Sequence, residues 1–321
     1  MQDRKRKTRA PPGLPTSACH LFPSPPTCDE RFNMGPTISD DTQSDKGSSP
    51  PFTVRALGLK EPVERLRNSY QSAHPFPHLI IDDLFPAQWL LPILNDYRHR
   101  SDWQWKSYDT ALQKKIGTAP NADLPDNIQR YFDFVYSGPF LRLLTSLTGI
   151  ENLLPDPSLY GGGMHVVSGG GHFDLHIDFQ KHPQTKLTNR LALLTYLNAD
   201  WDSRNGGNLE LWTVRPSARA VEIPPLFGRT VLMEQSKIAA HGHPSPVRPG
   251  LERKALIAYF YTNDATSEMK STTVYVSRPG QSASARLQSA LHNTLPTPMV
   301  RLLQKTRHML KARMTQRLPG R

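Results

Sequence analysis

Between residues 160 and 261 the chain is divided into short apolar segments, and their spacing restricts the fold more than any other feature. Seven segments rich in β-branched and aromatic residues are separated by Gly, Pro, Asn and Asp: Met164–Val167, Phe173–Asp178, Arg190–Leu197, Leu209–Val214, Ala220–Ile223, Thr230–Met233 and Ala255–Tyr261. Short strands with turn residues between them are typical of antiparallel sandwiches and barrels. We therefore predict a core of two antiparallel sheets.

A helical flank precedes this core. The apolar period predicts a short strand at His78–Ile81 and four helices, at Glu61–Ser72, Ala87–Arg98, Asp126–Val135 and Phe140–Leu147. Pro125 precedes the third helix and Gly149 follows the fourth, which are favoured positions for Pro and Gly at helix ends. The predicted fold class is therefore mainly β with a helical flank, an α+β arrangement.

The two ends of the chain differ from this body. Residues 1–55 are rich in Pro, Ser, Thr and Asp without an apolar period, which predicts a disordered leader and leaves Met34 as an alternative start to Met1. We expect a flank over 56–159, the catalytic core over 160–265 and a basic tail over 266–321. Within the tail, we predict that Met299–Leu318 is a helix with little contact to the core.

The cysteines and the hydropathy indicate the compartment. Cys19 and Cys28 are the only cysteines and both lie in the leader, which argues against a disulfide framework. No stretch has the roughly 18 apolar residues of a membrane span. The basic cluster Arg4–Lys7 is followed by no apolar core, so it does not resemble a secretory signal. We therefore predict a cytoplasmic protein without a transmembrane segment.

The net charge of +11 is concentrated at the C-terminal end. From Arg286 onward there are eight Lys/Arg and no Asp/Glu, whereas residues 56–285 have a net charge of +1. Basic helices bind phosphates, so residues 286–321 are a candidate surface for RNA or anionic lipid. A solvated basic helix is the simpler interpretation, and the sequence does not decide between the two.

Three residues carry the chemistry. His176 and Asp178 are separated by one residue on a predicted strand, where a period of two directs both side chains to the same face. His241 follows 63 residues after Asp178, which leaves room for the hairpins that would bring a facing strand to them. Two imidazoles and one carboxylate on one side of a metal form the facial triad of non-haem Fe(II) oxygenases. His243 is the rival to His241, because the two would share a strand face.

Arg253 and Tyr196 are candidates for binding a carboxylate. Arg253 lies at the start of the apolar segment that ends at Tyr261, and a planar guanidinium suits bidentate binding of a carboxylate. A buried Arg needs such a partner. Tyr196 offers a hydroxyl donor for the same group. A surface Arg and a core Tyr are the simpler interpretations of these two residues.

Five ordered motifs over residues 160–262 resemble the 2-oxoglutarate and Fe(II)-dependent oxygenases of the prolyl 4-hydroxylase type. They are Tyr160–His165, Gly170–Phe179, Leu194–Trp201, Gly206–Trp212 and His241–Pro244 followed by Arg253. The resemblance implies a double-stranded β-helix (jelly-roll) core with Fe(II) held by His176, Asp178 and His241. It also implies that 2-oxoglutarate chelates the iron, with its distal carboxylate on Arg253 and Tyr196. O₂ would be the second cosubstrate, with ascorbate as an additional candidate.

One position departs from the family pattern, and the substrate stays open. Animal prolyl hydroxylases have a Tyr ten residues before the first iron His, where this chain has Val166. His165, His172 and His182 are interpreted as outer or surface residues. We predict an enzyme, a dioxygenase that hydroxylates an unactivated C–H bond of a prolyl residue or of a small-molecule intermediate. The alternatives are a non-catalytic β-helix binding module and an adaptor for nucleic acid or a membrane surface through the basic tail.

Overall fold

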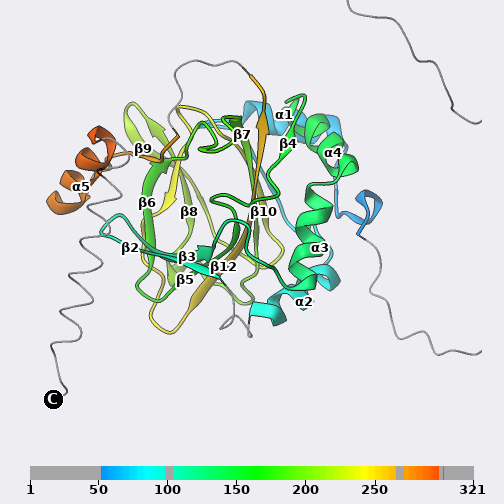
Figure 1. The fold of residues 1–321 in the computed structure, drawn as a ribbon, viewed down its shortest axis with the longest axis horizontal. Coiled ribbons are helices and arrows are strands. Elements are labelled where there is room, and N and C mark those ends of the chain that lie inside the picture. The colour runs from blue at the N-terminus through cyan, green and yellow to red at the C-terminus, as the bar shows by residue number, and fades with distance from the viewer. Residues whose placement is uncertain (1–51, 98–103, 265–270, 296–298, 300–321) are drawn as a thin grey trace, which may run out of the picture. The chain divides into compact units, whose positions relative to one another are not determined.

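The β-strands of the chain form one antiparallel sheet that curls on itself (Figure 1). The computed structural model describes residues 52–97, 104–264, 271–295 and 299. Neighbouring strands follow the order β1-β10-β7-β12-β5-β3-β6-β11-β8-β9. Their bounds are β1 His78–Ile81, β3 Gln113–Thr118, β5 Gly163–Ser168, β6 His172–Ile177, β7 Thr188–Tyr196, β8 Leu209–Val214, β9 Ser217–Ile223, β10 Thr230–Glu234, β11 Ala240–His243 and β12 Glu252–Thr262.

The curl brings two halves of the sheet face to face. Side chains of β7, β10 and β12 pack against those of β8 and β9 in a buried cluster that includes Leu194, Met233, Tyr259, Leu211 and Ile223. Such a double-layer core forms because side chains along each strand alternate between an inner and an outer face of the sheet. The predicted fold class, mainly β with a helical flank and a jelly-roll core, is confirmed.

Four helices cover the outer face of the half that contains β1, β7 and β12 (Figure 1). They are α1 Val63–Ser72, α2 Ala87–Asp96, α3 Asp126–Val135 and α4 Gly138–Thr148. The Ser137 side chain caps α4, and Gly149 ends it with a left-handed φ of 78° that suits glycine. The helices that the sequence predicted are confirmed with shifts of a few residues at their ends.

The predicted helical flank also contains a β-hairpin that the sequence analysis missed. Strand β2 (Trp105–Asp109) pairs with β3, and β3 bridges β5 and β6 in the sheet. The hairpin segment is rich in charged residues and lacks a clean apolar alternation. Its pairing with β5 and β6, a tertiary effect, therefore decides its conformation.

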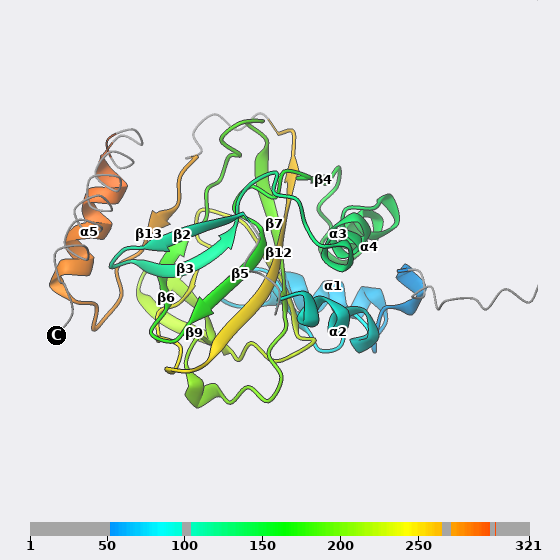
Figure 2. The same cartoon turned by 60° about the horizontal axis from the view of Figure 1, so that its bottom comes forward.

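The described C-terminal residues form a second addition to the core. Strand β13 (Val274–Tyr275) pairs with β6, and helix α5 (Ala283–Thr294) packs on β13, on the side of the sheet away from α1–α4 (Figure 2). Both elements lie within the segment that the sequence assigned to the basic tail. The predicted helix Met299–Leu318 lies outside the described residues, except for Met299.

The leader boundary also differs from the sequence expectation. Residues 1–51 lie outside the described part of the chain. Phe52 is ordered, with its ring stacked 4.0 Å from that of Trp89, and Val54–Ala56 form a 3₁₀ turn. The described structure thus includes Phe52 and the turn at Val54–Ala56, which reach into the predicted leader 1–55. Among the described residues, every helix is too short or too polar to cross a bilayer.

Candidate metal centre

His176, Asp178 and His241 converge inside the curled sheet. β6 and β11 are neighbouring antiparallel strands, and their register places His241 directly opposite His176. The Nε2 atoms of His176 and His241 lie 3.3 Å and 3.5 Å from the two carboxylate oxygens of Asp178. One ligand atom from each residue lies within 4.8 Å of the others, and all three residues are buried. The side chains could therefore share one metal ion.

The second nitrogen of each imidazole fixes how the rings face this cluster. His176 Nδ1 lies 2.8 Å from the carbonyl oxygen of Asp174, and His241 Nδ1 lies 2.9 Å from that of Ala239. A carbonyl oxygen only accepts, so both Nδ1 atoms donate, and in the neutral form of each ring Nε2 has a lone pair that faces Asp178. Metal-binding histidines in proteins are oriented by the same type of backbone hydrogen bond.

The charge state of the cluster also fits a metal cation. Burial, followed by the neighbouring His241, lowers the pKa of His176 to about 4, so this imidazole is neutral at pH 7. Burial opposes ionisation of Asp178, but the two histidines hold the pKa of its carboxyl well below the usual value. The neutral His176 imidazole and the ionised Asp178 carboxylate then direct lone pairs toward the same point. A cation between them relieves this contact, as an Fe(II) site requires.

Tyr259 supports the carboxylate of this cluster. Its hydroxyl donates to Asp178 Oδ2 at 2.8 Å from the facing strand β12. A hydrogen bond of this kind fixes a ligating carboxylate and is worth about 10–100-fold in metal affinity at many metal sites. Sequence reasoning did not single out Tyr259. The period of two that runs from Arg253 through Ile257 to Tyr259 along β12 could have found it, because these residues line one pocket.

His243 faces the same pocket but stands apart from the cluster. The pairing of β11 with β6 shifts register between His241 and His243, so His243 lies opposite Phe173 instead of Asp174. Its Nδ1 atom is buried without a hydrogen-bond partner among the described residues. This geometry favours His241 over His243 as the histidine that completes the triad.

Arg253 and Tyr196 meet at the other end of the pocket. The Arg253 side chain is 3% exposed, and its Nη2 atom donates to the Tyr196 hydroxyl at 3.2 Å. Its Nε atom donates to the carbonyl oxygen of Gly207 at 2.7 Å. No carboxylate of the described residues forms an ion pair with this guanidinium. A buried cation in this condition fits the carboxylate of a bound small molecule.

Gly207 makes the approach of Arg253 possible. Its φ is +67°, in the left-handed region, and a Cβ atom there would lie 3.0 Å from Arg253 Cδ and 2.9 Å from Val247 Cγ2. Any larger residue would thus strain the turn and displace the arginine. The Gly-Gly pair at 206 and 207 therefore has a packing role beside the site.

The remaining histidines have other environments. His165 lines the pocket, whereas Val166, the position that departs from the family pattern, belongs to the cluster under the helices. His172 is half-buried, with Nε2 3.2 Å from the Ala111 carbonyl oxygen. His182 is buried, with its Nε2 atom 3.5 Å from an Asp156 oxygen. Alternation along β5 therefore gives the pocket His165 instead of residue 166.

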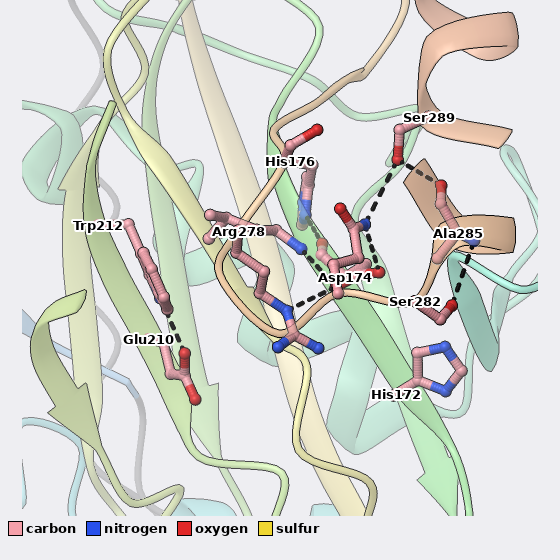
Figure 3. A network of polar contacts seen from close by, with 12 residues as sticks. His172, Asp174, His176, Glu210, Trp212, Arg278, Ser282, Ala285 and Ser289 are labelled. Atoms are coloured by element: carbon pink, nitrogen blue, oxygen red, sulfur yellow. Dashed lines mark hydrogen bonds and ion pairs between the residues drawn. The ribbon is translucent and has the colours of Figure 1, made fainter. Parts of the chain in front are cut away.

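A polar network outside the pocket supports the strand that carries His176 (Figure 3). Asp174 is buried, and Arg278 donates to its Oδ1 atom at 3.1 Å while Gln281 donates to Oδ2 at 3.0 Å. The backbone carbonyl of the same Asp174 holds the His176 imidazole. The segment that leads into α5 is thereby tied to the residue that orients a candidate metal ligand.

Comparison with known proteins agrees with this geometry. Residues 162–261 match the family model of the 2OG-Fe(II) oxygenase superfamily. This segment is similar to a 2OG-Fe(II) oxygenase domain. The matched range contains all five residues of the proposed site, and the family's cofactors are those that the triad and Arg253 suit. A search of curated proteins gave no match.

The fold is also similar to several solved structures. A prolyl 4-hydroxylase from Pseudomonas putida has 14% identity and a TM-score of 0.44, with 61% of this chain and 98% of that chain covered. A Phytophthora capsici prolyl 4-hydroxylase has 20% identity and a TM-score of 0.47, over 69% and 70%. A Trichoplax adhaerens prolyl hydroxylase, solved with a peptide fragment of hypoxia inducible factor, has 16% and 0.44, over 62% and 88%.

Proposed function

We propose that the protein is a dioxygenase that holds Fe(II) with His176, Asp178 and His241 and hydroxylates an unactivated C–H bond. The observation that carries this proposal is the buried arrangement of the triad, in which both Nε2 lone pairs face the carboxylate of Asp178. Arg253 and Tyr196 would hold the distal carboxylate of 2-oxoglutarate. The facial arrangement leaves one side of the metal open for cosubstrates.

The protein's own residues bind, orient and shield the reactants. Asp174 and Ala239 hold the two imidazoles through their backbone carbonyls, and Tyr259 holds the carboxylate. Apolar side chains that line the pocket, among them Leu194, Leu209 and Met233, would exclude water from the reacting centre. When bound, the iron and 2-oxoglutarate supply the oxidation, in which O₂ gives one oxygen atom to 2-oxoglutarate, yielding succinate and CO₂, and one to the substrate.

The substrate and the place of action are the finer parts of the proposal. The motif resemblance supports a prolyl residue of a protein or a small-molecule intermediate, and we place the reaction in the cytoplasm. Ascorbate is the reductant that we expect to sustain turnover by keeping the iron ferrous. The non-catalytic binding module remains the competing interpretation, because a β-helix core can also bind a ligand without chemistry.

Succinate formation separates the enzyme from the binding module. The purified full chain is incubated with Fe(II), 2-oxoglutarate and air, and succinate is measured by mass spectrometry. We expect formation that stops with a chelator and falls at least about 1000-fold in Asp178→Ala, because the only anionic ligand is lost. The control His172→Ala, at the start of the same strand, should retain the rate. A wild-type chain without Fe(II)-dependent succinate would favour the binding module.

A further inference from the structure

Lys115 reaches the same pocket from the hairpin that the sequence analysis missed. Strand β3 lies between β5 and β6, and the Lys115 side chain lines the pocket together with the triad. Its amine lies 3.4 Å from His165 Nδ1 and 4.0 Å from the centroid of the Phe173 ring. The Phe173 ring in turn stacks on the His176 imidazole at 3.6 Å. One aromatic ring therefore contacts both the amine and a metal-site histidine.

His165 accepts a hydrogen bond from this amine and does not compete with it as a cation. His165 Nε2 lies 3.1 Å from the carbonyl oxygen of Gly162, so Nε2 donates and Nδ1 accepts. Burial, followed by the charge of Lys115, lowers the pKa of His165 to about 3, so the ring is neutral. An ammonium has three donors, and His165 takes one of them. Two donors remain available to a ligand.

The charge of Lys115 has no counterpart among the described residues. None of their carboxylates lies within ion-pair distance of the amine, and the carboxylate of Asp178 is committed to the triad and Tyr259. Burial lowers the pKa of Lys115 to about 7, and Asp178 opposes this shift. A sheltered cation without a partner is unfavourable and becomes favourable when an anion binds. His243 adds an unpartnered nitrogen to the same pocket.

The pocket thus has one more cation than the cosubstrate uses. 2-Oxoglutarate has two carboxylates, of which one would meet the metal and the other Arg253. We propose that Lys115 binds an acidic group of the substrate, a carboxylate or a phosphate, and so restricts the enzyme to anionic substrates. This inference rests on the proposed function and makes Lys115 a specificity-determining residue. Its position beside Phe173 and His176 would place the carbon atoms next to the acidic group near the triad.

Anion binding to the loaded enzyme tests this proposal without knowledge of the substrate. The full chain is kept anaerobic with Fe(II) and saturating 2-oxoglutarate. Inorganic phosphate and acetate are titrated separately by calorimetry at constant ionic strength. The anion that binds more tightly indicates which acid the substrate has. The variants are Lys115→Met, which removes the charge, and Lys115→Arg, which keeps it. Lys114→Met is the matched control, because Lys114 is exposed on the opposite face of β3.

We expect wild type, Lys115→Arg and Lys114→Met to bind one anion. Lys115→Met should bind it about tenfold more weakly, the loss of a charge-assisted hydrogen bond. Affinity for 2-oxoglutarate should change less than twofold in all four proteins. Unchanged anion binding in Lys115→Met would overturn the proposal, as would the absence of saturable anion binding in wild type.

Two further results separate this inference from the proposed function. A loss of 2-oxoglutarate affinity in Lys115→Met as large as that in Arg253→Lys would assign Lys115 to the cosubstrate and overturn the proposal. Failure of the wild-type chain to bind Fe(II) and 2-oxoglutarate would instead contradict the proposed function. The phosphate and acetate titrations of that same unloaded protein would then decide the role of Lys115 alone.

Discussion

The metal triad and the two cations of the pocket differ in the charge of the ligand that each suits. At one end, Asp178 lies against two imidazoles and a tyrosine hydroxyl, and nitrogen and oxygen ligand atoms converge there. At the other end, Arg253 contacts a phenol and a carbonyl oxygen. Lys115, beside Phe173 and close to the triad, contacts a neutral imidazole. The triad suits a cation, whereas Arg253 and Lys115 suit anions.

This difference explains how one small cavity can order two unlike ligands. A metal ion would satisfy the lone pairs of the triad, while the carboxylates of organic acids would satisfy the two cations. Among the described residues, no Lys or Arg side chain forms an ion pair with the triad, and the two cations have no carboxylate in ion-pair contact. Substitutions at the metal end should therefore change metal binding, and those at the cationic end should change the affinity for acids.

The largest effect should come from replacing one of the two candidate histidines of β11. His241→Ala should weaken Fe(II) binding by about 100-fold or more, because a ligand that opposes His176 is lost. His243→Ala, its matched control two residues away, should change Fe(II) affinity less than about threefold. Anaerobic calorimetry with Fe(II) measures both. A larger loss of Fe(II) affinity in His243→Ala than in His241→Ala would assign the third metal ligand to His243 instead of His241.

A smaller effect is expected from Arg253→Lys at the cationic end. The charge remains, but the planar fork that contacts Tyr196 and Gly207 is lost, so KM for 2-oxoglutarate should rise about tenfold. Fe(II) affinity and the melting temperature should stay close to wild type. Arg248→Lys, on the exposed turn before β12, is the control. Equal KM values in the two variants would remove Arg253 from the cosubstrate site.

Tyr259→Phe should weaken Fe(II) binding by about tenfold. The substitution removes one hydrogen bond to Asp178 and leaves the ligands in place. Tyr261→Phe is the matched control on the same strand, because the Tyr261 hydroxyl is buried without a hydrogen-bond partner among the described residues. The two affinities are compared by anaerobic titration. Equal Fe(II) affinity in both variants would show that Tyr259 does not support the metal end.

The smallest effect should come from Arg278→Gln outside the pocket. Loss of the contact with buried Asp174 should lower the free energy of unfolding by about 1 kcal/mol. Gln281 still holds the carboxylate, so Fe(II) affinity should change less than twofold. Urea unfolding and Fe(II) titration give the two values. A metal affinity that falls while stability is unchanged would show that the C-terminal segment acts directly on His176.

The comparison also shows which parts of the site the sequence could predict. His176 and Asp178 follow from strand alternation alone, because their spacing is local. The choice between His241 and His243 does not, since it depends on the register of β11 against β6. Lys115 was missed for a related reason. Its strand is held by β5 and β6, which are far away in sequence, and its own residues have little apolar pattern.

For the helices too, the sequence predicted what local patterns determine and missed what depends on contacts far away in the sequence. α1 to α4 have amphipathic patterns and end signals, so the sequence predicted them closely. α5 was not predicted, because its docking depends on the contacts of Arg278 and Gln281 with Asp174, about a hundred residues earlier. The division of the chain into leader, flank, core and basic tail stays a prediction, and so does the interaction of residues 286–321 with RNA or lipid.

Anomalous diffraction at the iron edge tests the opposite character of the two ends most directly. Crystals of the full chain would be grown without oxygen in the presence of Fe(II) and 2-oxoglutarate. The account predicts one iron peak bonded to His176, Asp178 and His241 at about 2.0–2.2 Å. It also predicts the distal carboxylate of 2-oxoglutarate on Arg253, with Lys115 left unpaired. Iron bonded to His243 instead of His241, or the distal carboxylate on Lys115, would contradict it.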